Sequence, residues 1–172
     1  MKVGNHNTNG WKPATGVTAL LIGCFVMIAC SSIDCPLNSR VAVVYKLMGT
    51  ESPLADSLTI TTNRFDQSDP VLLNKVVNVD SFVLPISYQR PEDVLFFRRS
   101  NATGWSVTDT VVIKKQDTPH FEAVDCNPLF FHEIEQVSHT RLGIDSIVIH
   151  KSKVTYDASE PHLYIYFKHL LQ

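Results

Sequence analysis

The sequence lacks most of the short motifs that mark catalytic, metal-binding or nucleotide-binding proteins. Its 172 residues contain seven glycines and four cysteines. They include no glycine-rich phosphate cradle, no G-x-S-x-G elbow, no H-E-x-x-H motif and no C-x-x-C pair. The 15 Lys and Arg residues, against 17 Asp and Glu, form no cluster that could neutralise a phosphate backbone. We therefore predict no enzymatic activity, no metal, no cofactor and no nucleic-acid partner.

Long hydrophobic runs are absent except near the N-terminus. Residues 17–29 form an apolar run interrupted only by Thr18, Gly23 and Cys24, and two lysines precede it. The run is shorter than the roughly 20 residues that a membrane-spanning helix needs, but it suits the apolar core of a secretory signal. We therefore expect residues 1–29 to be an export signal.

Cys30 follows this run directly, preceded by Met, Ile and the small residue Ala. Bacterial lipoprotein signals share that order, and their cysteine becomes the acylated first residue of the mature chain. Cys24 lies in a better match to the motif, but cleavage there would leave an apolar core of only about five residues, where roughly 7–15 are usual. A cleaved signal without lipid and an uncleaved anchor are further alternatives. We favour Cys30 as the lipidation site, 30–36 as a tether and 37–172 as a single domain.

Two cysteines remain if Cys30 carries lipid and Cys24 leaves with the signal. These are Cys35 and Cys126, and an even number of thiols suits an oxidising compartment, so we predict a disulfide bond between them. Closing a loop of about 92 residues would stabilise the fold by roughly 4–5 kcal/mol in the chain-entropy model. Two buried free thiols are the alternative.

The remainder of the chain has the patterning of β-strands. Segments rich in β-branched and aromatic residues are separated by turn-forming Gly, Pro, Asn and Asp, and no helix-length amphipathic segment lies between them. This predicts an all-β fold, an antiparallel β-sandwich that is immunoglobulin-like or a partly closed barrel. Asn127-Pro128 could begin a short helix, but the poor helix formers at 137–140 favour a strand. The expected strands are 41–47, 57–62, 71–79, 82–86, 94–99, 106–114, 121–124, 131–139, 144–150 and 163–168.

Histidine, glutamate and aromatic residues are the remaining candidates for chemistry. The six histidines after the signal are interpreted as solvent-facing sheet residues: His120, His132, His139, His150, His162 and His169. Glu133 and Glu135 would share a strand face, which alone is weak support for acid–base catalysis. Most aromatic residues are expected in the core. Trp105 follows a hairpin-like turn, and we predict it to be exposed and a candidate ligand contact.

An Asp-Ser/Thr-apolar pattern occurs three times, beginning at Asp56, Asp109 and Asp145. Repeated entry into a strand from a turn explains it well, since Asp and Ser/Thr satisfy backbone groups there. The pattern also resembles the acceptor motif for O-glycosylation of exported proteins in Bacteroidetes-type bacteria. On that hypothesis the modified residues would be Ser57, Thr110 and Ser146.

Several segments together resemble an uncharacterised family of Bacteroidetes lipoproteins. The resemblance covers nearly the whole mature chain and implies an envelope location and this architecture, but it implies no catalytic residues. The segments are Cys30–Pro36, Leu58–Ile60, Phe82–Pro85, Asp125-Cys126, Thr140–Ile147 and Leu163–Phe167.

These observations lead to one functional expectation and one alternative. We expect a lipoprotein anchored in the bacterial outer membrane, acting as a non-catalytic binding or accessory module beside another envelope protein. The alternative is a carbohydrate-binding or carbohydrate-active surface lipoprotein that uses Trp105 and Glu133.

Overall fold

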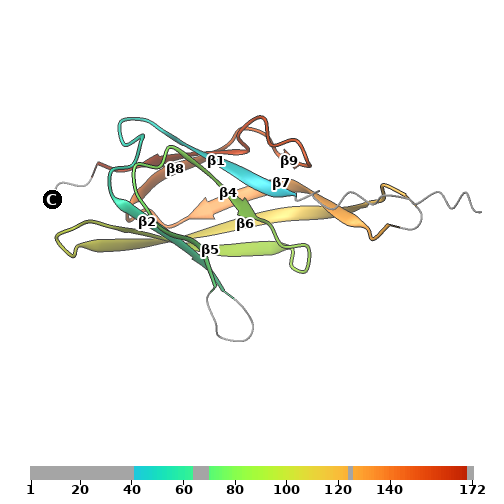
Figure 1. Ribbon diagram of the computed structural model, residues 1–172, viewed down its shortest axis with the longest axis horizontal. Helices are drawn as coiled ribbons and strands as arrows, with labels where there is room; N and C mark the ends of the chain where they lie inside the picture. Colours follow the sequence, from blue (N-terminus) through green and yellow to red (C-terminus); the bar gives the residue numbers. More distant parts are fainter. Residues whose placement is uncertain (1–40, 64–69, 124–125, 170–172) are drawn as a thin grey trace, which may run out of the picture. The chain divides into compact units, whose positions relative to one another are not determined.

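The computed structural model describes residues 41–63, 70–123 and 126–169, and this part of the chain is built from strands (Figure 1). It contains no helix, and therefore none long and apolar enough to cross a bilayer. The predicted all-β class is confirmed. The strands are β1 (Ala42–Met48), β2 (Ser57–Thr62), β3 (Val71–Val76), β4 (Ser81–Pro85), β5 (Glu92–Ser100), β6 (Ser106–His120), β7 (Leu129–His139), β8 (Ile144–Ile149), β9 (Lys153–Val154) and β10 (Leu163–Phe167).

The strands form two sheets that pack as a β-sandwich. The first has the order β4-β1-β10-β8 and the second β3-β2-β5-β6-β7-β9. All neighbours are antiparallel except β1 and β10, which run parallel. Edge strand β3 lies beside edge strand β4, and β7 lies beside β8, so the larger sheet curls as part of a barrel. The four outermost strands in this arrangement are β3, β4, β8 and β9.

One face of every long strand fills the core between the sheets. Strand β1 alternates buried and less buried residues, and β10 does the same, as expected where successive side chains point to opposite faces. Three rings pack at the centre, with Tyr45 stacked on Phe82 at 4.9 Å between centroids and Phe97 tilted against both. The other large side chains with almost no exposure are Leu47, Leu54, Leu58, Ile60, Leu84, Ile113, Ile144, Leu163, Ile165 and His162.

The predicted strands need correction around the end of β6 and at β9. Strand β6 continues to His120 because its ladder with β7 extends to the His120–Leu129 pair, and residues 121–123 follow it outside any strand. The separate strand predicted at 121–124 is therefore wrong within the described residues. Strand β9 was not predicted, because its two residues pair only with His132 and Glu133 and carry no periodic signal. The preference for a strand after Pro128 is confirmed by β7.

Candidate functional site

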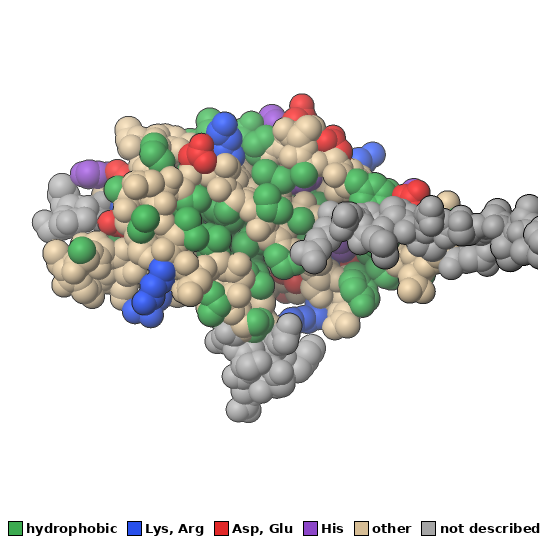
Figure 2. All heavy atoms as spheres, viewed as in Figure 1, with side chains coloured by type: hydrophobic (Ala, Val, Ile, Leu, Met, Phe, Trp, Pro, Cys, Tyr) green, Lys and Arg blue, Asp and Glu red, His purple; other side chains and the backbone are tan. Residues whose placement is uncertain are grey.

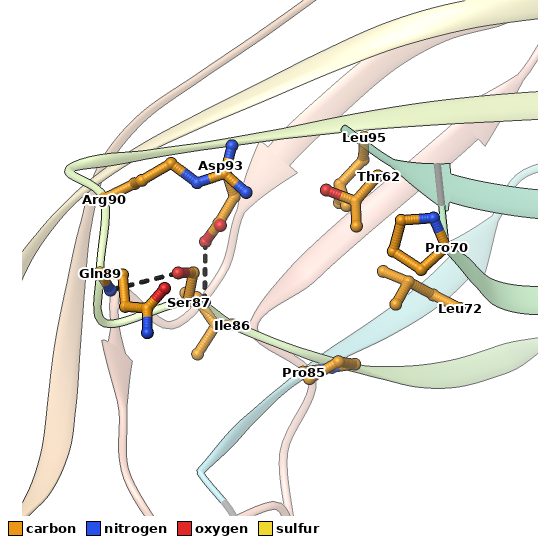
Figure 3. A pocket seen from close by; sticks show the side chains of 10 residues that line it. All are labelled: Thr62, Pro70, Leu72, Pro85, Ile86, Ser87, Gln89, Arg90, Asp93 and Leu95. Atoms are coloured by element: carbon orange, nitrogen blue, oxygen red, sulfur yellow. Dashed lines mark hydrogen bonds between the residues drawn. The ribbon is translucent and has the colours of Figure 1, made fainter. Parts of the chain in front are cut away.

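A cleft of about 460 Å³ opens where β3 and β4 approach one another (Figure 3). One part of it is apolar, with Pro70 and Leu72 opposite Pro85. Polar side chains from the segment between β4 and β5 gather at the other part. We call this the β3–β4 cleft, and its lining residues are Thr62, Pro70, Leu72, Pro85, Ile86, Ser87, Gln89, Arg90, Asp93 and Leu95.

Asp93 supplies the carboxyl group among the lining residues of this cleft, and only 8% of its surface is exposed. Its Oδ2 accepts a hydrogen bond of 3.2 Å from the Ser87 amide. Burial raises the pKa of Asp93 above its ordinary value, and the Ser87 amide and the charges of Lys115 and Arg90 oppose that rise. The carboxyl therefore protonates more readily than an exposed aspartate.

Asp93 is one end of a chain of buried charges. The Lys115 side chain has no exposed surface, and its Nζ lies 4.0 Å from Asp93 Oδ2 and 3.0 Å from Asp117 Oδ1. The same Nζ donates to the Arg90 carbonyl at 2.7 Å. Asp117 Oδ1 lies in turn 2.6 Å from His132 Nδ1. Each charge in this chain is thus held by an opposite charge or by a backbone group, as buried charges must be.

His132 lines a second cleft of about 430 Å³. Tyr88 is 57% exposed there and stacks on Phe130, with 4.9 Å between ring centroids. Ile86 borders both clefts, whereas Ser87 and Gln89 line the first and Tyr88 lines the second. The segment between β4 and β5 therefore presents alternate residues to two clefts, and the buried charges run beneath it.

The other end of the core is closed by charged groups with a structural role. Arg99 is 5% exposed and lies six residues beyond Asp93 on β5. Its Nε donates to Asp56 at 2.6 Å, its Nη1 to the Lys168 carbonyl at 2.7 Å and its Nη2 to Glu51 at 3.1 Å. All three nitrogens are thus used within the protein, so this end offers Arg99 to no ligand.

The chemistry open to the clefts follows from the groups that line them. The Asp117–His132 pair resembles two members of a nucleophile-activating triad, but among the described residues no hydroxyl or thiol is hydrogen-bonded to His132. No group of three or more His, Cys, Asp and Glu residues in the described ranges is arranged to hold a metal ion. The arrangement can bind an apolar group and a hydrogen-bonding group side by side.

The structure places Trp105 away from both clefts. It follows the turn between β5 and β6, where Asn101 Oδ1 accepts hydrogen bonds from the Thr103 and Trp105 amides. It is 38% exposed, so its predicted exposure is confirmed. Glu133 is exposed on β7 opposite Gln116. Because Gln116 is ten residues along β6 from Ser106, Trp105 and Glu133 lie roughly 33 Å apart.

The three candidate O-glycosylation residues lie on different strands and line neither described cleft. Ser57 Oγ is enclosed and has no hydrogen-bond partner, so transfer of a glycan to it would have to precede folding. Thr110 and Ser146 are half-buried on β6 and β8. Glycosylation at these positions stays a prediction.

Three of the four cysteines, Cys24, Cys30 and Cys35, lie outside the described residues. Cys126 is described and is buried. Lipidation at Cys30 and the Cys35–Cys126 bond therefore stay predictions.

The interpretation of all six histidines as solvent-facing is wrong for two of them. His132 is 4% exposed and His162 is 0% exposed. His162 Nδ1 accepts a hydrogen bond of 3.0 Å from the Val44 amide. Burial lowers the pKa of His162, which keeps the imidazole neutral for this role.

The cleft residues Asp93, Lys115 and Asp117 were not singled out from the sequence. The sequence of β6 could have indicated two of them. Lys115 and Asp117 occupy the same alternate positions as Val111 and Ile113, whose side chains face the core. The predicted strand ended at residue 114 and so stopped before them. Asp93 carried a comparable signal, because it continues the inward positions of Leu95 and Phe97 on β5, but the predicted strand began at residue 94.

Comparison with known families shows which family the chain belongs to but assigns it no activity. The chain belongs to a family of unknown function, DUF6452, whose model matches residues 57–167. That range covers β2 to β10 and includes every lining residue of both clefts except Val41. No curated protein and no solved structure matches the chain significantly.

Proposed function

We propose that this protein is a non-catalytic binding module of the bacterial cell envelope, with the β3–β4 cleft as its ligand site. The observation that carries the proposal is the cleft itself, which opens between two edge strands and joins an apolar part to a polar part. Its charged side chains are hydrogen-bonded within the protein, since Asp93 accepts from the Ser87 amide and the Arg90 guanidinium donates to Asn63. Clefts of this size and mixed lining are typical of binding sites.

A lipid anchor at Cys30 completes the proposal. An acylated cysteine would hold the domain at the outer membrane, since each buried CH₂ contributes about 0.8 kcal/mol to membrane binding. Ten residues lie between Cys30 and the first described residue, Val41, so the tether reaches at most roughly 40 Å. The domain would then act close to the membrane surface, on a neighbouring envelope protein.

The carbohydrate alternative gains no support from the site. Trp105 and Glu133 are too far apart to contact one sugar ring, and neither lines a described cleft. A glycan site built on both residues is therefore disfavoured.

The binding proposal is tested by site-specific photo-crosslinking in cells. A photo-reactive amino acid at Gln89, which is exposed and lines the cleft, should give a discrete adduct with an envelope protein. The matched control is Leu142, which is 59% exposed in the turn before β8 and should give none. Equal adducts from the two positions, or none from either, would contradict the proposed site.

The anchor is tested separately by metabolic labelling with a fatty-acid analogue. The wild type should be labelled and should sediment with membranes, whereas Cys30→Ser should be unlabelled. Labelling that persists in Cys30→Ser but disappears in Cys24→Ser would move the anchor to Cys24.

A further inference from the structure

The four edge strands of the two sheets differ in how well they are protected from pairing with another strand. An exposed edge presents unpaired amide and carbonyl groups, and proteins block it with bulges, charges, proline or very short strands. Strand β3 has two register shifts against β2 and an exposed Lys75 at a φ of 46°. Strand β9 has two residues, and β8 has a register shift against β10 and carries the exposed Asp145. These three edges are protected.

Strand β4 has only one of these features within its own residues, Pro85 at its end, and Ser81 and Val83 precede it without charge or bulge. Its five residues, Ser-Phe-Val-Leu-Pro, carry no charge, and they pair with β1 in unbroken register. Val83, at its centre, is 55% exposed. Figure 2 shows hydrophobic side chains over the middle of the face on which β4 lies, with most charged side chains toward the margins. Strand β4 is therefore the one regular, uncharged edge in the described structure.

The backbone of β4 points hydrogen-bonding groups away from β1 at alternate residues. The Leu47 amide donates to the Asp80 carbonyl at 2.8 Å, and this pair is in register with the ladder between β1 and β4. Hydrogen-bonded pairs alternate along an antiparallel ladder, so Phe82 and Leu84 face β1. Ser81 and Val83 then direct their amides and carbonyls outward, where β3 lies across the seam.

The β3–β4 cleft adjoins the end of this edge and defines what could lie along it. Pro85 and Ile86 lead from β4 directly into the cleft, with Leu72 and Leu95 across from them. The ionisable side chains of the lining are Arg90 and Asp93, which have opposite signs. Because their charges offset each other and β4 has none, charge complementarity favours an uncharged, apolar occupant.

We propose that the seam between β3 and β4 accepts an extended segment of a partner protein, which pairs antiparallel with β4 and places an apolar side chain in the cleft. This rests on the proposed function and names its class of partner. The outward amides and carbonyls of Ser81 and Val83 bind the backbone of the segment, and Leu72, Ile86 and Leu95 contact its side chain. Main-chain hydrogen bonds supply affinity and the cleft supplies selectivity, as in other cases of strand addition.

The probe for this proposal is a displayed library of random heptapeptides, selected on the full chain in detergent. The expected peptides are uncharged, with apolar residues at alternate positions. Binding of a selected peptide should slow hydrogen exchange at the Ser81 and Val83 amides of the wild-type protein. This readout needs no variant and therefore does not depend on whether a variant folds.

Two substitutions at one position separate backbone pairing from side-chain contact. Val83→Pro removes an outward amide but no ladder bond to β1, and proline is tolerated at such edge positions. It should weaken peptide binding at least tenfold. Val83→Thr keeps the amide and should change the affinity less than twofold, with thermal unfolding as the check that both variants fold.

The outcomes distinguish failure of the strand-addition proposal from failure of the proposed binding function. Selection of no peptide, selection of charged peptides only, or protection of amides outside β4 would overturn strand addition. If the Gln89 cross-link still forms in those cases, the binding module stands and its partner is not an extended strand. Loss of both signals would remove both proposals.

Discussion

Asp109 holds the turn between β7 and β8 with both of its carboxylate oxygens. It is 1% exposed, and Oδ1 accepts hydrogen bonds of 2.7 Å from Thr140 Oγ1 and the Leu142 amide. Oδ2 accepts from the Gly143 amide at 2.7 Å and the Ile144 amide at 2.9 Å. A carboxylate that satisfies several backbone amides contributes more to stability than a neutral hydrogen bond does. This explains why Asp109 occupies the core face of β6.

Replacement of Asp109 should therefore be strongly destabilising. Asp109→Ala leaves three backbone amides without their partner, and we expect the free energy of unfolding to fall by about 3–4 kcal/mol. Urea denaturation measures this loss. Asp145→Ala, at an exposed position on β8, is the control and should change stability by less than about 0.5 kcal/mol. Equal losses in the two variants would show that the turn does not depend on this carboxylate.

The side chain of His162 takes the place of a backbone hydrogen-bond acceptor where β1 and β10 meet. Its amide donates to the Val44 carbonyl at 2.8 Å, and its Nδ1 accepts from the Val44 amide at 3.0 Å. A protonated ring could not accept that hydrogen bond. Burial and the positive charge of Lys151 lower the pKa of His162, and Asp157 opposes them.

The lowered pKa of His162 predicts a loss of stability in mild acid. Below the unfolded-state pKa of 6.5, the unfolded chain binds a proton that the folded chain does not. Unfolding thus becomes more favourable as pH falls toward the folded-state pKa. Urea denaturation between pH 7.5 and pH 5 should show this decline, and His162→Gln should reduce it. The exposed His150→Gln variant should not reduce it, and an identical decline in all three proteins would contradict the assignment.

At the scale of elements, β6 determines where the site forms. Its inward positions are Asp109, Val111, Ile113, Lys115 and Asp117, so one strand face is apolar at its middle and charged toward both ends. The ladder with β7 shifts register between Lys114 and Lys115, next to the first of the cleft-end charges. The long β6–β7 hairpin therefore supplies both the core and the buried charges beneath the clefts.

Replacing Lys115 alone should destabilise the protein more than replacing Lys115 and Asp117 together. Lys115→Met removes the ammonium group that lies between two largely buried carboxylates, Asp93 and Asp117, so the free energy of unfolding should fall by about 3 kcal/mol. The double variant Lys115→Met/Asp117→Leu should regain at least about 1 kcal/mol, because it also removes one orphaned charge. Lys114→Met is the control. The half-exposed ion pair between Lys114 and Glu92 contributes less than about 1 kcal/mol to stability. Strictly additive losses would show that the two side chains are not coupled.

At the scale of the whole molecule, the predicted disulfide would tie the tether to the domain. Under non-reducing conditions, proteolysis should release one peptide that links Cys35 to Cys126. Cys35→Ser should lower the unfolding free energy by about 4 kcal/mol, because the unfolded chain loses its cross-link. Alkylation of both thiols in the native, unreduced protein would contradict the bond.

Most of the architecture could be predicted from the sequence because it depends on local alternation. Val43, Tyr45 and Leu47 on β1, and Leu58 and Ile60 on β2, are buried at every second position, which is visible in the residue order alone. Strand β9 and the extension of β6 to His120 could not be predicted in this way. Their pairing is with residues of β7, and nothing in their own composition requires it.

The sequence alone determined the all-β class and the strand phases, since side chains that alternate between water and core must follow the period of the strand. Only the tertiary structure decided that Asp93, Lys115, Asp117 and His132 meet. It also decided that β4 is left with an open edge beside a cleft. The reason is that the free energies of burying a charge and of leaving an edge unpaired depend on which strands become neighbours, and residue order does not specify those neighbours locally.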